Sequence, residues 1–161
     1  MRFPAVNQQP WSALIKTAKI LVLPAVVFFA LVIHARAEGP DIIETRMSGQ
    51  DLLEGDFDGI RAVVEAKGDV EPLEEPAKAM ARWIKQFPAQ FPVGSEQGHG
   101  TRALSTIWSD AAGFRKASVD MVLASDRLAQ LAKAGDAEGV AVQVKVVGST
   151  CRACHQIYRS R

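Results

Sequence analysis

The feature that most constrains this chain is the run Cys151-Arg152-Ala153-Cys154-His155. The spacing C-x-x-C-H is the signature of covalent haem attachment, in which two thiols add to the haem vinyl groups and the histidine binds the iron. The chain has only these two cysteines, too few for a four-ligand zinc site, and it lacks the βαβ pattern of a thioredoxin-like CxxC. The motif therefore predicts one covalent haem c, with Cys151 and Cys154 as the thioether cysteines and His155 as the iron ligand.

The N-terminal segment has the pattern of an export signal. Basic residues precede an apolar run over residues 20–33, and Ala35-Arg36-Ala37 follows it as an Ala-x-Ala cleavage site. The run is shorter than the roughly 20 residues that cross a bilayer. We therefore expect residues 1–37 to be a secretory signal peptide cleaved after Ala37, and the mature protein to be periplasmic. The alternative is an uncleaved segment that anchors the protein to a membrane.

The net charge of the chain changes from positive to negative when residues 1–37 are removed. The whole chain has 19 basic and 18 acidic residues. Residues 1–37 contain four of the basic residues and none of the acidic ones, which leaves 15 basic and 18 acidic residues, a net charge of −3. Since no basic stripe remains, we do not expect nucleic acid as a partner.

Four stretches of helical apolar periodicity follow the signal segment. Gly68 is predicted to lie at the C′ position after the first stretch, Gly135 ends the third, and Asp136 is a predicted N-cap of the fourth. A loop rich in glycine and proline covers residues 88–100. The four predicted helices cover residues 41–67, 72–87, 101–134 and 137–159.

Four helices joined mostly by short links predict an all-α fold, an antiparallel four-helix bundle over residues 38–161. The covalently attached haem would lie inside one end of the bundle, near the C-terminus of the sequence. Pro76 is expected to delay the start of the second helix. The residues expected to pack inside the bundle include Met80, Trp83, Trp108, Met121 and Leu123.

Beyond the haem motif, three further segments carry a family resemblance. They are Phe87-Pro88 with Phe91-Pro92, Thr101-Arg102-Ala103-Leu104 followed by Ile107-Trp108-Ser109-Asp110-Ala111-Ala112-Gly113-Phe114, and the tail Cys151–Arg159. Together with a CxxCH placed late in a helical chain, they resemble the class II cytochromes c, the cytochrome c prime family. The resemblance extends over essentially all of residues 38–161.

The resemblance implies roles for two arginines. Arg46 matches the first-helix arginine that pairs with a haem propionate, and a planar guanidinium suits a carboxylate. Arg159 matches a basic residue near the proximal imidazole, on the same helix face as His155. A cation there would oppose positive charge on the haem and its histidine. Alternatively, Arg46 is an exposed helix-surface residue, and Arg159 is a solvated cation that favours the helix dipole.

At the position that faces the sixth coordination site of the iron, this chain departs from the family. High-spin members have an aliphatic residue there and low-spin members a methionine ligand, but this chain has Gln50. Three outcomes are open for Gln50: an iron left five-coordinate, a hydrogen bond to a ligand on the distal side, or a side chain that turns out to water, leaving Leu53 and Phe57 to line the pocket. Met47 is a rival iron ligand, although a core-filling methionine is the commoner case.

The resemblance implies a haem protein that binds small gaseous ligands, nitric oxide and carbon monoxide, at a five-coordinate iron and exchanges electrons with a redox partner protein. A six-coordinate, low-spin electron carrier is the alternative. We do not expect an enzyme, because peroxide cleavage usually needs a distal histidine, and residues 38–161 contain only His99 and His155. Family members often form homodimers through the first two helices, for which Ile60, Val63 and Val64 would supply apolar surface.

Overall fold

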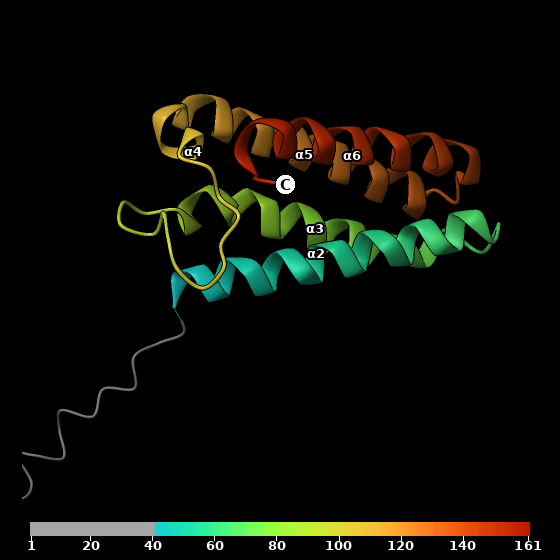
Figure 1. The fold of residues 1–161 in the computed structure, drawn as a ribbon. Coiled ribbons are helices and arrows are strands. Elements are labelled where there is room, and N and C mark those ends of the chain that lie inside the picture. The colour runs from blue at the N-terminus through green and yellow to red at the C-terminus, as the bar shows by residue number, and fades with distance from the viewer. Residues whose placement is uncertain (1–40) are drawn as a thin grey trace, which may run out of the picture. The chain divides into compact units, whose positions relative to one another are not determined.

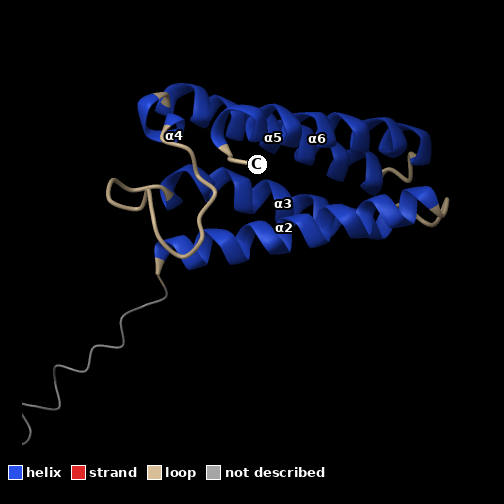
Figure 2. Ribbon diagram, viewed as in Figure 1, coloured by secondary structure: helices blue, strands red, loops and turns tan. Residues whose placement is uncertain are grey.

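The computed structural model describes residues 41–161, so the expected signal peptide over residues 1–37 lies outside the described residues. Four long helices run back and forth beside one another (Figures 1 and 2). These are α2 (Ile42–Glu65), α3 (Glu74–Gln86), α5 (Ala111–Lys133) and α6 (Ala137–Tyr158). Within the described residues there is no β-strand, only an isolated bridge between Ala103 and Arg159. The predicted all-α, antiparallel four-helix bundle is confirmed.

None of the helices in this part of the chain is both long enough and apolar enough to cross a membrane.

Aspartates begin three of the four long helices. The side chains of Asp41, Asp110 and Asp136 each accept a hydrogen bond from a backbone N–H in the first turn of α2, α5 and α6. The predicted N-cap Asp136 is therefore confirmed. Gly135 takes the left-handed conformation that ends α5, as predicted, with φ 67°. After α2, however, the left-handed residue is Lys67, with φ 54°, so the C′ position predicted for Gly68 is wrong by one residue.

The second and third helices start later than predicted. A short 3-10 helix over Glu71–Leu73 precedes α3, which leaves Pro76 in the first turn of α3, as expected. The single helix predicted from residue 101 is wrong. Residues 101–105 form no helix, and α4 (Thr106–Ser109) is separated from α5 by Asp110, whose φ of −122° and ψ of 53° are not helical. The backbone groups of residues 102–104 instead bond the end of α6.

The main core lies between α3, α5 and α6, and α2 closes one side of it. Helix α3 packs along α5 and α5 along α6, whereas α2 packs on α3 and makes fewer contacts with α6. Met80 and Met121 are buried, as predicted. Leu123 is not, since 63% of it is exposed. A second core cluster fills one end of the bundle, with Ile107, Phe114 and Tyr158 buried among further aromatic side chains.

The homodimer prediction loses one of its three surface residues. Ile60 is only 1% exposed and belongs to the main core, so it cannot supply apolar surface to a partner. Val63 and Val64 are half-buried and pack against the same core. The homodimer stays a prediction.

Trp83 packs inside the bundle, as predicted, and glycine makes this possible. Its indole lies against α2 at Gly49, where a Cβ atom would overlap the ring. The indole Nε1 is buried with no hydrogen-bond partner among the described residues. An unpaired buried donor costs about 1–3 kcal/mol, so the packing of the ring has to offset that cost. The close approach of Trp83 to Gly49 therefore sets the separation of α2 and α3.

We expect Gly49→Ala to lower the free energy of unfolding by about 1–3 kcal/mol, because the indole must move to make room for the methyl group. Gly55→Ala is the matched control on the same helix. No atom lies within 4 Å of its Cβ position, so this variant should gain roughly 0.4–1 kcal/mol from the lower entropy of the unfolded chain. Urea unfolding of both holoproteins measures the difference. Equal changes in the free energy of unfolding for the two substitutions would contradict the close contact between Trp83 and Gly49.

Candidate functional site

Both cysteines of the CxxCH motif lie on the inner side of α6. Cys151 packs against the main core and Cys154 against the aromatic cluster at the end of the bundle. Burial raises the pKa of both thiols, that of Cys154 to about 11 with a further contribution from Cys151. Both are therefore neutral thiols directed into the bundle. Two such thiols one helical turn apart, followed directly by a histidine, fit the attachment of haem c.

His155 is exposed as a residue, and its ring lies beside the guanidinium of Arg159. The distance from Arg159 Nη1 to His155 Nδ1 is 3.4 Å. The pKa of His155 is lowered, first by partial burial of the ring and second by the charge of Arg159. The neutral imidazole, the form that binds metals, is thereby favoured. The structure thus places Arg159 beside His155, the predicted proximal ligand, as the resemblance implied.

Arg46 is 2% exposed, so the alternative of an exposed helix-surface arginine is wrong. Nη1 donates to the Gln90 carbonyl at 3.2 Å and to Ser95 Oγ at 2.9 Å. Nη2 donates to the Ser95 carbonyl at 2.7 Å and to Thr101 Oγ1 at 2.9 Å. The guanidinium also lies 4.4 Å from the centre of the Phe91 ring. Since these bonds use all four terminal N–H groups, only Nε–H is free for the predicted propionate.

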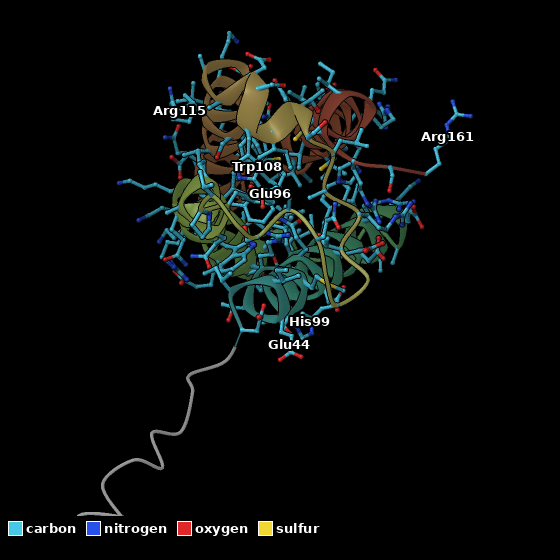
Figure 3. The ribbon with its side chains drawn as sticks, turned by 60° about the vertical axis from the view of Figure 1, so that its left-hand side comes forward. Glu44, Glu96, His99, Trp108, Arg115 and Arg161 are labelled. Atoms are coloured by element: carbon cyan, nitrogen blue, oxygen red, sulfur yellow. The ribbon has the colours of Figure 1, made fainter. Side chains whose placement is uncertain are left out.

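The loop that Arg46 holds is also tied to the end of α6. The backbone N–H of Leu104 donates to the Tyr158 carbonyl at 3.0 Å, and that of Ser160 to the Arg102 carbonyl at 2.8 Å. Thr106 Oγ1 donates to the Ile157 carbonyl at 2.6 Å. The loop therefore connects α2 with the tail of the helix that carries the haem motif, as the end-on view of the bundle shows (Figure 3).

An aromatic cluster supports this end of the bundle from inside. Phe114 lies edge-on to both Phe91 and Tyr158, with ring centroids 5.0 and 5.2 Å apart. The Tyr158 hydroxyl donates to Asp110 Oδ2 at 2.7 Å. Burial, followed by this bond and the charge of Asp110, raises the pKa of Tyr158 to about 12. The end of α6 is thereby fixed to the start of α5.

On the α2 side, Gln50 is half-buried, and within residues 41–161 its carboxamide makes no hydrogen bond. Leu53 and Phe57 are half-buried and pack against the main core. Met47 is 38% exposed, so the interpretation as a core-filling methionine is wrong. Gln50 therefore has a free carboxamide on the helix assigned to the distal side.

Sequence reasoning missed several residues that shape this site. Ser95 was treated only as part of a loop. Thr101 was treated as part of a helix and of the family resemblance, and Tyr158 and Asp110 likewise had no role of their own. Asp110 could have been noticed because aspartate is a preferred N-cap residue. No local sequence feature marks Ser95 or Thr101 as a partner of Arg46. His99 is exposed and contacts Asp41 and Glu44. In the described part of the chain, no group of three or more potential side-chain ligands could hold a free metal ion.

Comparison with known proteins finds one family. The family model described as Cytochrome C' matches residues 41–159. The cytochrome c' of Rubrivivax gelatinosus is 31% identical over 123 residues, which cover 75% of this chain and 95% of the relative. A cytochrome c-556 of Agrobacterium fabrum is 28% identical over 144 residues, covering 88% and 96% of the two chains.

Solved structures agree with this family assignment. The crystal structure of the Rubrivivax gelatinosus protein aligns with a TM-score of 0.68 over 74% of this chain and 95% of that one. A nitric oxide complex of a variant cytochrome c prime from Alcaligenes xylosoxidans also aligns with a TM-score of 0.68, at 28% identity, over 75% and 94% of the two chains.

We expect Arg46→Ala to lower the free energy of unfolding by roughly 2–4 kcal/mol, because it leaves the loop acceptors unpaired and opens a buried space. Arg61→Ala is the control on the same helix. The Arg61 side chain is 50% exposed and pairs only with surface carboxylates, so its loss should change stability by less than about 0.5 kcal/mol. Urea unfolding measures both, and limited proteolysis of the loop over residues 91–105 reports its release. A loop equally resistant in both variants would refute the role of Arg46.

Proposed function

The chain belongs to the cytochrome c prime family, and from that premise we propose that it is a periplasmic haem protein that binds small gaseous ligands, nitric oxide and carbon monoxide, and exchanges single electrons. Proteins of this family carry a covalently bound haem c. When bound, that group supplies an iron that takes up such ligands and changes its oxidation state by one electron. The observation that carries the proposal is the pairing of Cys151, Cys154 and His155 on α6 with a distal position on α2 that offers only a carboxamide.

On the proximal side, each residue has a separate role. The inward thiols of Cys151 and Cys154 fix the position of the haem through thioether bonds. His155 presents Nδ1 to Arg159, so we assign Nε2 to the iron. A guanidinium beside Nδ1 offers that nitrogen no acceptor, which limits the electron density that the imidazole can donate. Arg159 therefore weakens the proximal ligand and shifts the reduction potential.

On the distal side, Gln50 leaves the sixth position open to an external ligand. A carboxamide is a weak ligand for haem iron, so we propose five-coordinate iron. Burying the amide unpaired beside the haem would cost about 1–3 kcal/mol, which favours a hydrogen bond from Gln50 to water or to a bound ligand. The proposed site is therefore more polar on its distal side than an aliphatic residue would make it.

The alternative is a low-spin electron carrier. Met47 precedes Gln50 by three residues on α2 and is partly exposed, so its thioether is not committed to the core. The relatives of this chain include proteins named cytochrome c' and cytochrome c-556, and family membership does not by itself identify the sixth ligand. We propose no enzymatic activity, since no histidine lies on α2.

The optical absorption spectrum of the matured protein tests the proposal. We expect broad high-spin ferric and ferrous spectra that change when nitric oxide or carbon monoxide is added, because the sixth position is open. Sharp low-spin bands in both oxidation states, unmoved by either gas, would show an internal ligand and favour the electron carrier.

Gln50→Leu should raise the dissociation rate of carbon monoxide from the ferrous protein by roughly threefold to tenfold. This is the effect of losing one neutral hydrogen bond of about 0.5–1.5 kcal/mol. The stretching frequency of bound carbon monoxide should shift as well, whereas Met47→Leu should change neither value. If Met47→Leu instead converts a low-spin spectrum to a high-spin one, Met47 is the ligand.

A further inference from the structure

A groove runs along the bundle between α3 and α5. Its volume is about 1020 Å³, and its lining comes from these two helices, from α4 and from residues 88–93. No residue of α2 or α6 contributes to it. The groove is therefore separate from the proximal and distal faces of the haem site.

Basic side chains outnumber acidic ones around this groove. Lys78, Arg82, Lys85 and Arg115 line it, against a single carboxylate, Asp126. Lys78 is already paired with glutamates of α3. Arg82, Lys85 and Arg115 are exposed and form no ion pair within residues 41–161. Because residues 38–161 carry a net charge of −3, this is a local concentration of positive charge on an acidic protein.

Three apolar side chains that line the groove are also exposed. Val93 is 90% exposed, Val119 54% and Leu123 63%. Leu123, which was predicted to face the core, thus lines the groove instead. An apolar surface rimmed by charges is typical of a protein interface.

The floor of the groove is the outer side of the aromatic cluster at the haem end. Phe91, Trp108 and Phe114 line the groove and belong to the cluster against which Cys154 packs. The Phe91 ring lies 5.9 Å from that of Trp108 and 5.0 Å from that of Phe114. Viewed from this end, Trp108 and Arg115 lie away from the side on which Arg161 ends the chain (Figure 3). The aromatic cluster therefore contacts both the groove and Cys154, the predicted thioether cysteine.

We propose that this groove is the docking surface for an acidic redox protein, which delivers one electron toward the Cys154 side of the haem through the aromatic cluster. The proposal rests on the electron exchange proposed above. The partner is oxidised by one electron and the haem is reduced by one, with no proton or atom transferred. The cations attract the partner's carboxylates, and the exposed valines and leucine supply a small apolar contact, as in transient electron-transfer complexes.

Binding of an oxidised plant-type [2Fe–2S] ferredoxin, an acidic redox protein, to the ferric holoprotein tests the docking without electron transfer. The groove variant is Lys85→Glu with Arg115→Glu. The matched control is Arg127→Glu with Lys145→Glu, since both residues are exposed, have no ion pair within the described residues and lie outside the groove. The two double variants carry the same net charge, so long-range attraction is equal in both.

We expect the groove variant to bind the ferredoxin at least about tenfold more weakly at low salt, and the control less than about threefold. Salt should weaken binding of the wild type and have little effect on the groove variant. The indole N–H resonance of Trp108 should shift on binding. Equal loss in the two variants, an unmoved Trp108 resonance, or binding to vesicles containing phosphatidylglycerol in place of the ferredoxin would overturn the proposal.

Stopped-flow reduction separates this proposal from the function on which it rests. We expect ascorbate to reduce the haem at the same rate in both variants and reduced ferredoxin to react more slowly with the groove variant only. If ascorbate reduces the haem and reduced ferredoxin reacts equally fast with both variants, the groove proposal fails and the proposed electron exchange is unaffected. If ascorbate, dithionite and ferricyanide cannot reduce and reoxidise the haem, both the groove proposal and the proposed electron exchange fail.

Discussion

The buried guanidinium of Arg46 is the contact on which the shape of the haem end depends. Placing a charged group at 2% exposure is unfavourable unless its donors are satisfied, and burial accordingly lowers the pKa of Arg46. Four hydrogen bonds to the loop and the face of Phe91 supply that compensation. Because all the acceptors lie on residues 90–101, the loop has to follow α2. The Phe91 ring that Arg46 contacts also belongs to the aromatic cluster and lines the groove. Arg46 therefore helps to position both the cluster and the groove.

The other anchor is the pair formed by Tyr158 and Asp110. Asp110 breaks the predicted third helix, caps α5 and accepts the hydrogen bond of Tyr158. Tyr158 lies three residues after His155, in the last turn of α6. Asp110 therefore both breaks the predicted helix and, through Tyr158, anchors the turn of α6 that carries His155. A continuous helix from residue 101 would remove the loop bonds to α6 and the acceptor of Tyr158 together.

The features of the fold that could be predicted are those that local sequence patterns encode. The CxxCH run, the apolar periodicity and the capping aspartate at 136 are local, and the bundle and its last helix follow from them. The helix expected from residue 101 failed because residues 101–105 are held by Arg46 and by the tail of α6, which are distant in the chain. Leu123 and Ile60 failed for a related reason. An apolar stripe does not say which neighbours will cover it: Leu123 of α5 lines the exposed groove, whereas Ile60 of α2 is covered by the main core.

The two sides of the proposed haem site differ in how the structure positions them. On the proximal side, α6 is fixed by the core, by the loop and by Tyr158. On the distal side, α2 contacts α6 sparingly and is positioned by Arg46 at one point and by the Gly49–Trp83 contact at another. Gln50 directly follows Gly49, so the placement of its carboxamide depends on how closely the indole approaches the helix. In the proposed site, the properties of the distal side would therefore be set by α2 and α3 together, and the residue at position 49 would matter to ligand binding as well as to packing.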